Sequence, residues 1–228
     1  MGAELLNLRD IHFTTPLILM NGALFYDLEN HRVVDKCEMD GKTVARVLEL
    51  CHEGGKEPLL YRAEGDSVGM TYTKPTNPLE WEFLKERGSQ FPRQIRQVEE
   101  YDRESPAIYF STQDTYERLK RISDRLQQVP GISYVLYQDN YHDNNWYLEI
   151  FSDQGGKDKG LLHLKRLTGA GRTVAFGDNF NDLPMLRVAD VALVVENGQP
   201  AVKEEADLVI GPNHLDGVAE YLSHYAEL

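Results

Sequence analysis

Two aspartates, Asp178 and Asp182, follow an apolar, β-branched run near the C-terminus and stand four residues apart. The run 173–177 predicts a buried strand, and the segment that begins at Asp182 predicts a helix. Open α/β sheets bind ligands beyond the carboxyl ends of their strands, so both carboxylates are expected to point at one place there. Hard oxygen ligands of this kind suit Mg²⁺. The alternative is an Asx turn in which Asp182 only caps the helix, because Asn and Asp are common turn residues.

The same segment, residues 177–182, resembles the fourth motif of the haloacid dehalogenase superfamily of phosphohydrolases, in the Gly-Asp-Asn-x-Asn-Asp form of its Cof-like branch. Three more stretches resemble this family in the same order. Residues 16–27 resemble the strand and the Asn-Gly-Ala turn that lead into the large cap of that branch, and residues 156–167 resemble the third-motif lysine with its helix. Residues 197–218 are similar to the C-terminal strand and closing helix. The resemblance therefore covers nearly the whole chain.

The resemblance implies roles for four polar residues. Asp178 would bind Mg²⁺, and Asp182 would position the ion or its waters, which makes Mg²⁺ the implied cofactor. Lys159 would stabilise the phosphate, as a compact ammonium does, and we favour it over Lys157 because a glycine and then a helix follow it. Asn181 would contact the phosphate or the lysine. For each, the alternative is an ordinary turn residue or a solvated surface lysine.

The family's first motif, Asp-x-Asp-Gly-Thr, which would supply the nucleophile and the acid/base, is absent from the sequence. Motifs one and two should precede the Asn-Gly-Ala turn, yet only twenty residues precede Asn21. We therefore expect a core that lacks its first two strands.

Two stretches imitate the motif. The first contains Asp40, which lies beyond the turn and is predicted to be a helix N-cap. Asp10, with His12, would require two parallel strands joined without a crossover helix, which parallel pairing does not allow.

The order of elements predicts an α/β fold, in which a Rossmann-like core, incomplete at its N-terminus, carries an inserted α+β cap domain. Strands and helices alternate after residue 158, as in a Rossmann-like core, whereas hairpins and helices are mixed before it. We assign residues 1–24 and 152–228 to the core and residues 25–151 to the cap. Strands are predicted at 17–20, 24–27, 32–38, 59–63, 69–73, 95–98, 107–111, 133–137, 146–151 and 173–176.

Helices of the predicted cap are expected to begin at Asp40, at Asn77 with Pro at the first helical position, and at Thr112. Four large aromatic residues of this segment are predicted to lie in the cap core rather than to stack on a sugar: Trp81, Tyr137, Trp146 and Tyr147.

The composition excludes several kinds of partner. A net charge of −13 argues against nucleic acid and against an anionic membrane. The sequence shows neither an apolar run long enough to span a bilayer nor a signal peptide. Cys37 and Cys51 lack metal-like spacing and are read as buried thiols of a cytoplasmic protein. The negative field repels a phosphorylated substrate, which favours a site built on Mg²⁺ and lysine.

By resemblance, the expected activity is Mg²⁺-dependent hydrolysis of a small phosphomonoester such as a sugar phosphate, so the expected partner is a small phosphorylated metabolite. Three interpretations stay open. The chain is a truncated form of a working phosphatase, inactive as it stands; or it is a natural pseudo-phosphatase that binds a ligand or a partner; or Asp10 and His12 form an unusual active site. Because strands are missing, we also expect residues 17–20 to close onto 173–176, or a homodimer to cover the gap.

Overall fold

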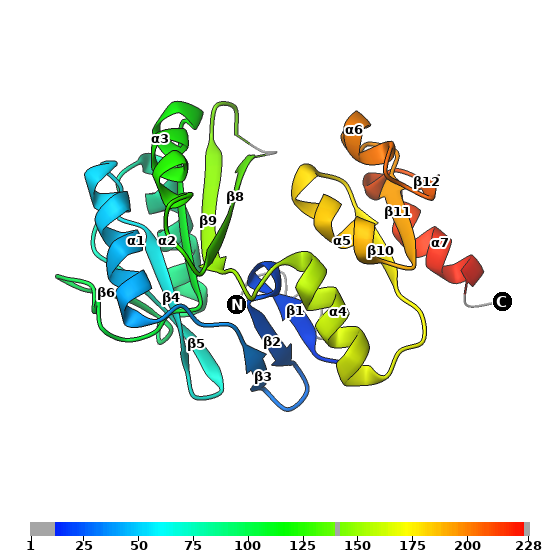
Figure 1. Ribbon diagram of the computed structural model, residues 1–228, viewed down its shortest axis with the longest axis horizontal. Coiled ribbons are helices and arrows are strands. Elements are labelled where there is room, and N and C mark those ends of the chain that lie inside the picture. The colour runs from blue at the N-terminus through cyan, green and yellow to red at the C-terminus, as the bar shows by residue number, and fades with distance from the viewer. Residues whose placement is uncertain (1–11, 140–141, 226–228) are drawn as a thin grey trace. The chain divides into compact units, whose positions relative to one another are not determined.

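The computed structural model describes residues 12–139 and 142–225, and the chain forms two compact units, Met1–Gly155 and Gly156–Leu228 (Figure 1). Helices and strands are mixed throughout, which confirms the predicted α/β class. Among the described residues, no helix has the length and apolar character needed to cross a membrane.

A six-stranded sheet in the order β6-β5-β4-β7-β9-β8 forms the centre of the first unit. The β5–β6 pair is parallel, and the other neighbouring pairs are antiparallel. Such antiparallel hairpins mixed with helices are the predicted α+β pattern. The strands are β4 (Leu59–Glu64), β5 (Ser67–Tyr72), β6 (Ile95–Gln97), β7 (Tyr109–Asp114), β8 (Ile132–Gln138) and β9 (Trp146–Ser152).

Helices cover both faces of this sheet. Helices α1 (Gly41–Glu53) and α3 (Tyr116–Leu126) lie on one face, where Leu48 and Ile122 pack in a core with Phe110 of β7. Helix α2 (Pro78–Gln90) lies on the other face, where its Leu84 packs against residues of β4 and β5. The side chains of each strand alternate between these two environments.

Two of the three predicted helix starts are confirmed by their caps. The Asp40 carboxylate accepts the Thr43 N–H at 2.8 Å, and the Asn77 side chain accepts the Glu80 N–H at 2.9 Å. The predicted start at Thr112 is wrong, because β7 continues to Asp114 and α3 begins only at Tyr116. Pairing of this stretch with β9 extends the strand.

A separate three-stranded antiparallel sheet contains β1 (Leu17–Leu19), β2 (Leu24–Asp27) and β3 (Arg32–Lys36). The short 3-10 turn η2 (Met20–Gly22) joins β1 to β2, and Asn21 in it has a left-handed φ of 51°. The structure thus groups β2 and β3 with β1. The domain boundary at residue 24 and the closure of residues 17–20 onto 173–176 stay predictions.

The second unit contains a parallel sheet in the order β10-β11-β12. Its strands are β10 (Val174–Gly177), β11 (Val191–Val195) and β12 (Leu208–Ile210). The elements between and around them are α4 (Lys157–Thr168), η3 (Phe180–Asp182), α5 (Leu183–Val188), α6 (Pro200–Lys203), η4 (Asn213–Leu215) and α7 (Gly217–Tyr225). Apolar clusters form on both faces of the sheet, so the unit has the layered, alternating arrangement predicted for this part of the chain.

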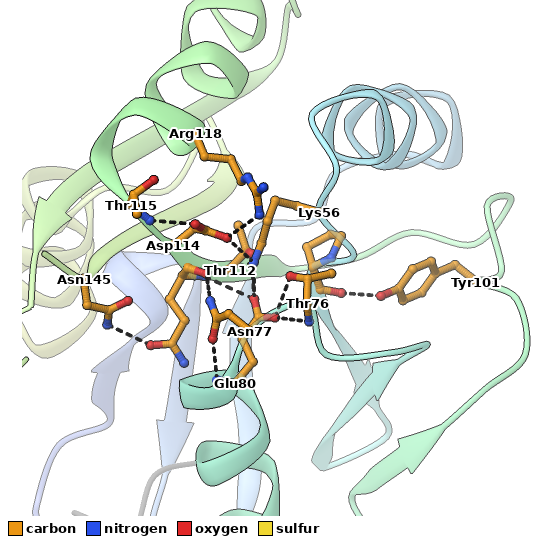
Figure 2. A network of polar contacts seen from close by, with 12 residues as sticks. Lys56, Thr76, Asn77, Glu80, Tyr101, Thr112, Asp114, Thr115, Arg118 and Asn145 are labelled. Carbon is orange, nitrogen blue, oxygen red and sulfur yellow. Dashed lines mark hydrogen bonds and ion pairs between the residues drawn. The ribbon is translucent and has the colours of Figure 1, made fainter.

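A buried lysine joins three elements of the first unit (Figure 2). The Lys56 side chain is 0% exposed, and its Nζ donates to the Gln113 carbonyl at 2.8 Å. The same ammonium pairs with Glu80 Oε1 at 2.9 Å and with Asp114 Oδ2 at 3.2 Å. Glu80 also accepts the Thr112 hydroxyl at 3.0 Å. The network connects the loop after α1 to the first turn of α2 and to the end of β7.

The predicted aromatic core is confirmed in part. Trp146 packs against the core under α1 and α3. Trp81 of α2 is 55% exposed and belongs to none of the apolar clusters, so its prediction is wrong. Tyr137 and Tyr147 are direct cross-strand neighbours on β8 and β9, with stacked rings 5.5 Å apart. Both are partly buried and belong to none of the apolar clusters.

Candidate functional site

The end of β10 places two aspartates together. Strand β10 pairs with β11 up to Gly177, and Asp178 follows directly. A Cβ atom at residue 177 would lie 2.8 Å from the Cβ of Asp182, which is too close for any side chain. The glycine therefore allows the turn η3 to fold back so that Asp182 packs against the strand end. The two aspartates are in contact at this strand end. The predicted convergence of Lys159 with them stays a prediction.

Asp182 is the most constrained residue of this cluster, and it is 5% exposed. Its Oδ2 accepts the backbone N–H groups of Asp178 at 3.0 Å and of Asn179 at 3.2 Å. Its Oδ1 lies 2.5 Å from the Nζ of Lys157. The alternative considered from the sequence, in which Asp182 only caps the helix that follows it, does not describe these contacts, because its side chain makes no cap hydrogen bond to α5 and accepts instead from the turn that precedes it. The same side chain also brings a second carboxylate to Asp178.

The two carboxylates differ in electrostatic character. Burial, with the neighbouring Asp182 carboxylate, raises the pKa of Asp178 above its ordinary value. Burial would also raise the pKa of Asp182, but Lys157 and the two backbone N–H groups outweigh it, so that pKa is lowered. Asp178 thus carries a charge that its surroundings disfavour, and a cation beside it would relieve this repulsion.

The lysine that reaches Asp182 is Lys157, the first residue of α4. The residue pattern predicts Lys159 instead, which is the third residue of this helix and is exposed. Residues two positions apart on a helix do not share a face, so the ammonium groups of Lys157 and Lys159 lie on different sides of the first turn of α4. The sequence did not predict the contact of Lys157 with Asp182. Residue spacing alone does not show which side chains in the first turn of a helix face the rest of the protein. The phosphate role of Lys159 stays a prediction.

The neighbouring loop holds Asp178 from the other side. The Gln199 N–H donates to the Asp178 carbonyl at 2.8 Å, and Gly198 approaches the same carbonyl so closely that an added Cβ would lie 3.1 Å from it. Asn181 is partly buried in η3, and its side chain makes no hydrogen bond to the residues that the structure describes. Its amide is therefore available to a ligand, and its predicted contact with phosphate stays a prediction.

The donor set of the site suits Mg²⁺. This ion usually keeps several waters and binds proteins through one or two carboxylates, and Asp178 with Asp182 supplies that number. No group of three or more His, Cys, Asp or Glu residues suited to a metal occurs within 12–139 and 142–225. A closed protein cage is therefore not the kind of metal site that the described part of the chain builds.

The alternative active site is only partly described. Asp10 lies outside the described residues. The His12 side chain is 77% exposed and forms an ion pair with Glu29. Asp40, the other residue that imitates the first motif, is engaged in capping α1.

Comparison with known proteins gives one family over almost the whole chain. Residues 4–222 match the model of the haloacid dehalogenase-like hydrolases. A pyridoxal phosphate phosphatase of Escherichia coli (strain K12) is 26% identical over 219 residues, which cover 91% of this chain and 76% of that protein. Phosphoglycolate phosphatase 2 of Saccharolobus solfataricus is 48% identical over 71 residues, which cover 29% of this chain and 30% of that one.

Solved structures give the same fold. A sugar phosphatase of HAD subclass IIB matches 99% of this chain and 81% of its own, with a TM-score of 0.73 and 22% identity. A protein from Thermotoga maritima matches 98% of this chain and 81% of its own, with a TM-score of 0.70 and 23% identity. The predicted core-and-cap fold is confirmed by these likenesses.

Proposed function

Because the chain belongs to the haloacid dehalogenase-like hydrolase family, and the relatives described above include phosphatases, we propose that it carries the metal-binding and phosphate-binding part of a Mg²⁺-dependent phosphatase that acts on a small phosphomonoester such as a sugar phosphate. The observation that carries this proposal is the cluster of Asp178, Asp182 and Lys157 at the end of β10. Two carboxylates and an ammonium at a strand end are the chemistry that a metal ion and a phosphate need together.

Each residue has a task that follows from its contacts. Asp178 would bind the metal ion, since it is the carboxylate whose charge is least compensated. Asp182 would hold the turn and position the ion or its waters. When bound, Mg²⁺ would neutralise charge on the phosphoryl oxygens. Lys157 keeps Asp182 ionised and oriented.

The phosphate would be held by Lys159 and Asn181 in this proposal. Lys159 is exposed on the first turn of α4, and Asn181 has a side-chain amide without an internal partner among the described residues. An ammonium acts on phosphate as a point charge and needs no fixed geometry. The first turn of α4 also presents backbone N–H groups, which favour anions.

The matched relatives support the size of the substrate. By their names, one acts on pyridoxal phosphate and another on phosphoglycolate, and both compounds are small phosphomonoesters. The net charge of −13 disfavours large anionic partners such as nucleic acid.

Metal binding tests the carboxylate assignment directly. We expect Mn²⁺, used as a paramagnetic substitute for Mg²⁺, to bind the 228-residue chain and to broaden the amide signals of Asp178 and its neighbours. Asp178→Asn should weaken this binding by at least about tenfold, since even outer-shell partners of metal ligands cost that much. Glu204→Gln removes one exposed acid from the same unit and serves as the control. Equal binding by both variants would remove Asp178 from the site.

Phosphate binding and turnover are separate questions. In the presence of Mg²⁺ we expect the chain to bind inorganic phosphate, and Lys159→Met to weaken that binding. We expect no measurable hydrolysis of p-nitrophenyl phosphate by the 228-residue polypeptide, because its sequence contains no Asp-x-Asp-Gly-Thr and such groups act as a unit. Turnover that survives repurification and disappears on Asp10→Asn would favour the alternative nucleophile.

A further inference from the structure

A cavity of about 650 Å³ opens at one edge of the six-stranded sheet in the first unit. Because β5 and β6 are parallel, the segments that leave their carboxyl ends, 73–74 and 97–103, lie at the same edge of the sheet, and both line the cavity. A third segment runs from the end of α1 to the start of β4, which is antiparallel to β5, and contributes His52 and Glu57. The volume is in the range of pockets that hold small ligands.

Glu57 is a fixed carboxylate in the wall of this cavity. Its side chain is 16% exposed, and its Oε1 lies 2.6 Å from Nδ1 of His52. Its Oε2 accepts the Thr73 hydroxyl at 3.4 Å. These contacts hold the carboxylate from two elements. Neither partner carries a permanent positive charge, so a cationic group of a ligand can still pair with Glu57.

Tyr101 supplies an aromatic group to the same wall. Its hydroxyl donates to the Pro58 carbonyl at 2.5 Å and accepts the Thr73 N–H at 3.4 Å. Burial raises the pKa of Tyr101 to about 12, so the phenol stays neutral at physiological pH. The ring is therefore uncharged and fixed in position, and an aromatic ring attracts an organic cation to its face.

Four more charged side chains line the cavity, and none of them has an ion pair or side-chain hydrogen bond with a residue that the structure describes: Lys74, Glu99, Glu100 and Arg103. All four are exposed. Other exposed charges of this unit do form pairs, as Arg96 does with Glu64 on the neighbouring strands. Charges of both signs therefore surround one cavity without neutralising each other.

We propose that this cavity binds a free amino acid with a basic side chain, such as L-arginine. The lining carries three carboxylates, of Glu57, Glu99 and Glu100, and two permanent cations, Lys74 and Arg103. It therefore complements a ligand with two positive groups and one negative group. The α-ammonium and the guanidinium would pair with the carboxylates, and the ligand carboxylate with Lys74 or Arg103.

Other kinds of ligand fit this lining less well. No group of three or more His, Cys, Asp or Glu residues suited to a metal occurs in the described part of the chain, so these acids are not arranged to hold a divalent cation. A phosphate or a dicarboxylate would face three carboxylates, and a polyamine would be repelled by Lys74 and Arg103. An apolar ligand would desolvate these charges without pairing them, which is costly.

The test compares L-arginine with agmatine, which is L-arginine without its carboxylate, by saturation-transfer NMR on the whole chain. We expect saturable binding of L-arginine with a Kd on the order of 1 mM, and weaker binding of agmatine. Lys74→Met and Arg103→Met should each weaken the binding of L-arginine about tenfold, since each removes a charge-assisted hydrogen bond to the ligand carboxylate. Neither should weaken the binding of agmatine, which offers that cation nothing to pair with.

The control is Lys85→Met, which removes an exposed lysine from α2 of the same unit, outside the lining of the cavity. All three variants should unfold at the wild-type temperature, because none of the charges removed has a partner among the described residues. Absence of L-arginine binding by the wild type, agmatine binding as tight as that of L-arginine, or equal loss in the control would overturn the proposal. Every residue in it belongs to the first unit, so Asp178→Asn should leave L-arginine binding unchanged, and a failure of the metal assignment is distinguishable.

Discussion

At the end of β10, the charge of the Asp182 carboxylate is compensated by neighbouring groups, whereas the charge of the Asp178 carboxylate is not. Asp182 has an ammonium and two backbone N–H groups, whereas Asp178 faces the charge of Asp182. Sites that bind cations commonly keep such uncompensated charge, and it costs stability when the ion is absent. The stability lost through the charge of Asp178 and the stability gained through that of Asp182 should therefore be measurable separately, by substituting each aspartate in turn.

In buffer with a chelator at neutral pH, Asp178→Asn should stabilise the second unit, and Asp182→Asn should destabilise it by about 1 kcal/mol. The lowered pKa of Asp182 means that its stabilisation is present above 3.8 and is lost as pH falls through the folded-state value. The raised pKa of Asp178 means that its penalty is absent below 3.8 and grows as pH rises above it. Hydrogen exchange of β10 amides measures both effects.

The two differences should disappear one after the other as the pH falls: the effect of Asp178→Asn is gone by 3.8, whereas the effect of Asp182→Asn is lost only below 3.8, as the pH falls through the lowered folded-state pKa of Asp182. Opposite signs for the two variants at neutral pH are the expected result. A stabilising Asp182→Asn would show that the contact with Lys157 contributes nothing in solution.

Sequence alone predicted the two aspartates, because the strand-end motif is local. It did not predict Lys157 as the partner of Asp182, since that contact depends on the phase of α4 and on the fold-back that Gly177 allows. The same contrast holds for elements. The caps of α1 and α2 are local and were predicted, whereas the start of α3 was misplaced because pairing with β9 extends β7.

At the scale of elements, Lys56 connects α2 and β7 through charge rather than through apolar packing (Figure 2). Its side chain and that of Glu80 are almost fully buried, so neither can turn to water if the other is lost. Removing one member of a buried ion pair strongly destabilises the fold, because the charge of the other member is left uncompensated.

Lys56→Met keeps the aliphatic length but leaves Glu80 and Asp114 without their shared cation. We expect it to lower the free energy of unfolding of the first unit by about 3–5 kcal/mol. Both tryptophans of the chain, Trp81 and Trp146, lie in this unit, so urea unfolding followed by their fluorescence reports it. Lys120→Met is the control, since its pair with Asp124 is exposed. Similar losses in both variants would mean that burial of Lys56 is unimportant.

At the scale of the whole molecule, the parallel sheet of the second unit is small for its class. Purely parallel sheets are normally covered on both faces, and open strand edges favour pairing with another chain. Strand β12 pairs with β11 and lies at one end of the sheet order. Its Leu208 is 50% exposed and its Val209 is 44% exposed. Leu222 on α7 is 48% exposed.

We propose that a second copy of the chain covers this apolar edge, and we expect a homodimer in solution. Light scattering after size exclusion should give twice the mass of one chain at micromolar concentration and a lower mass on dilution. Leu208→Lys places a charge on the edge strand, which natural edges use against pairing, and should yield the monomer without loss of Mn²⁺ binding. Leu162→Lys changes an exposed leucine of α4 and is the matched control. A monomeric mass for the wild type at every concentration would show that the exposed edge of β12 does not pair, and the exposure of Leu208 and Val209 would then need another explanation.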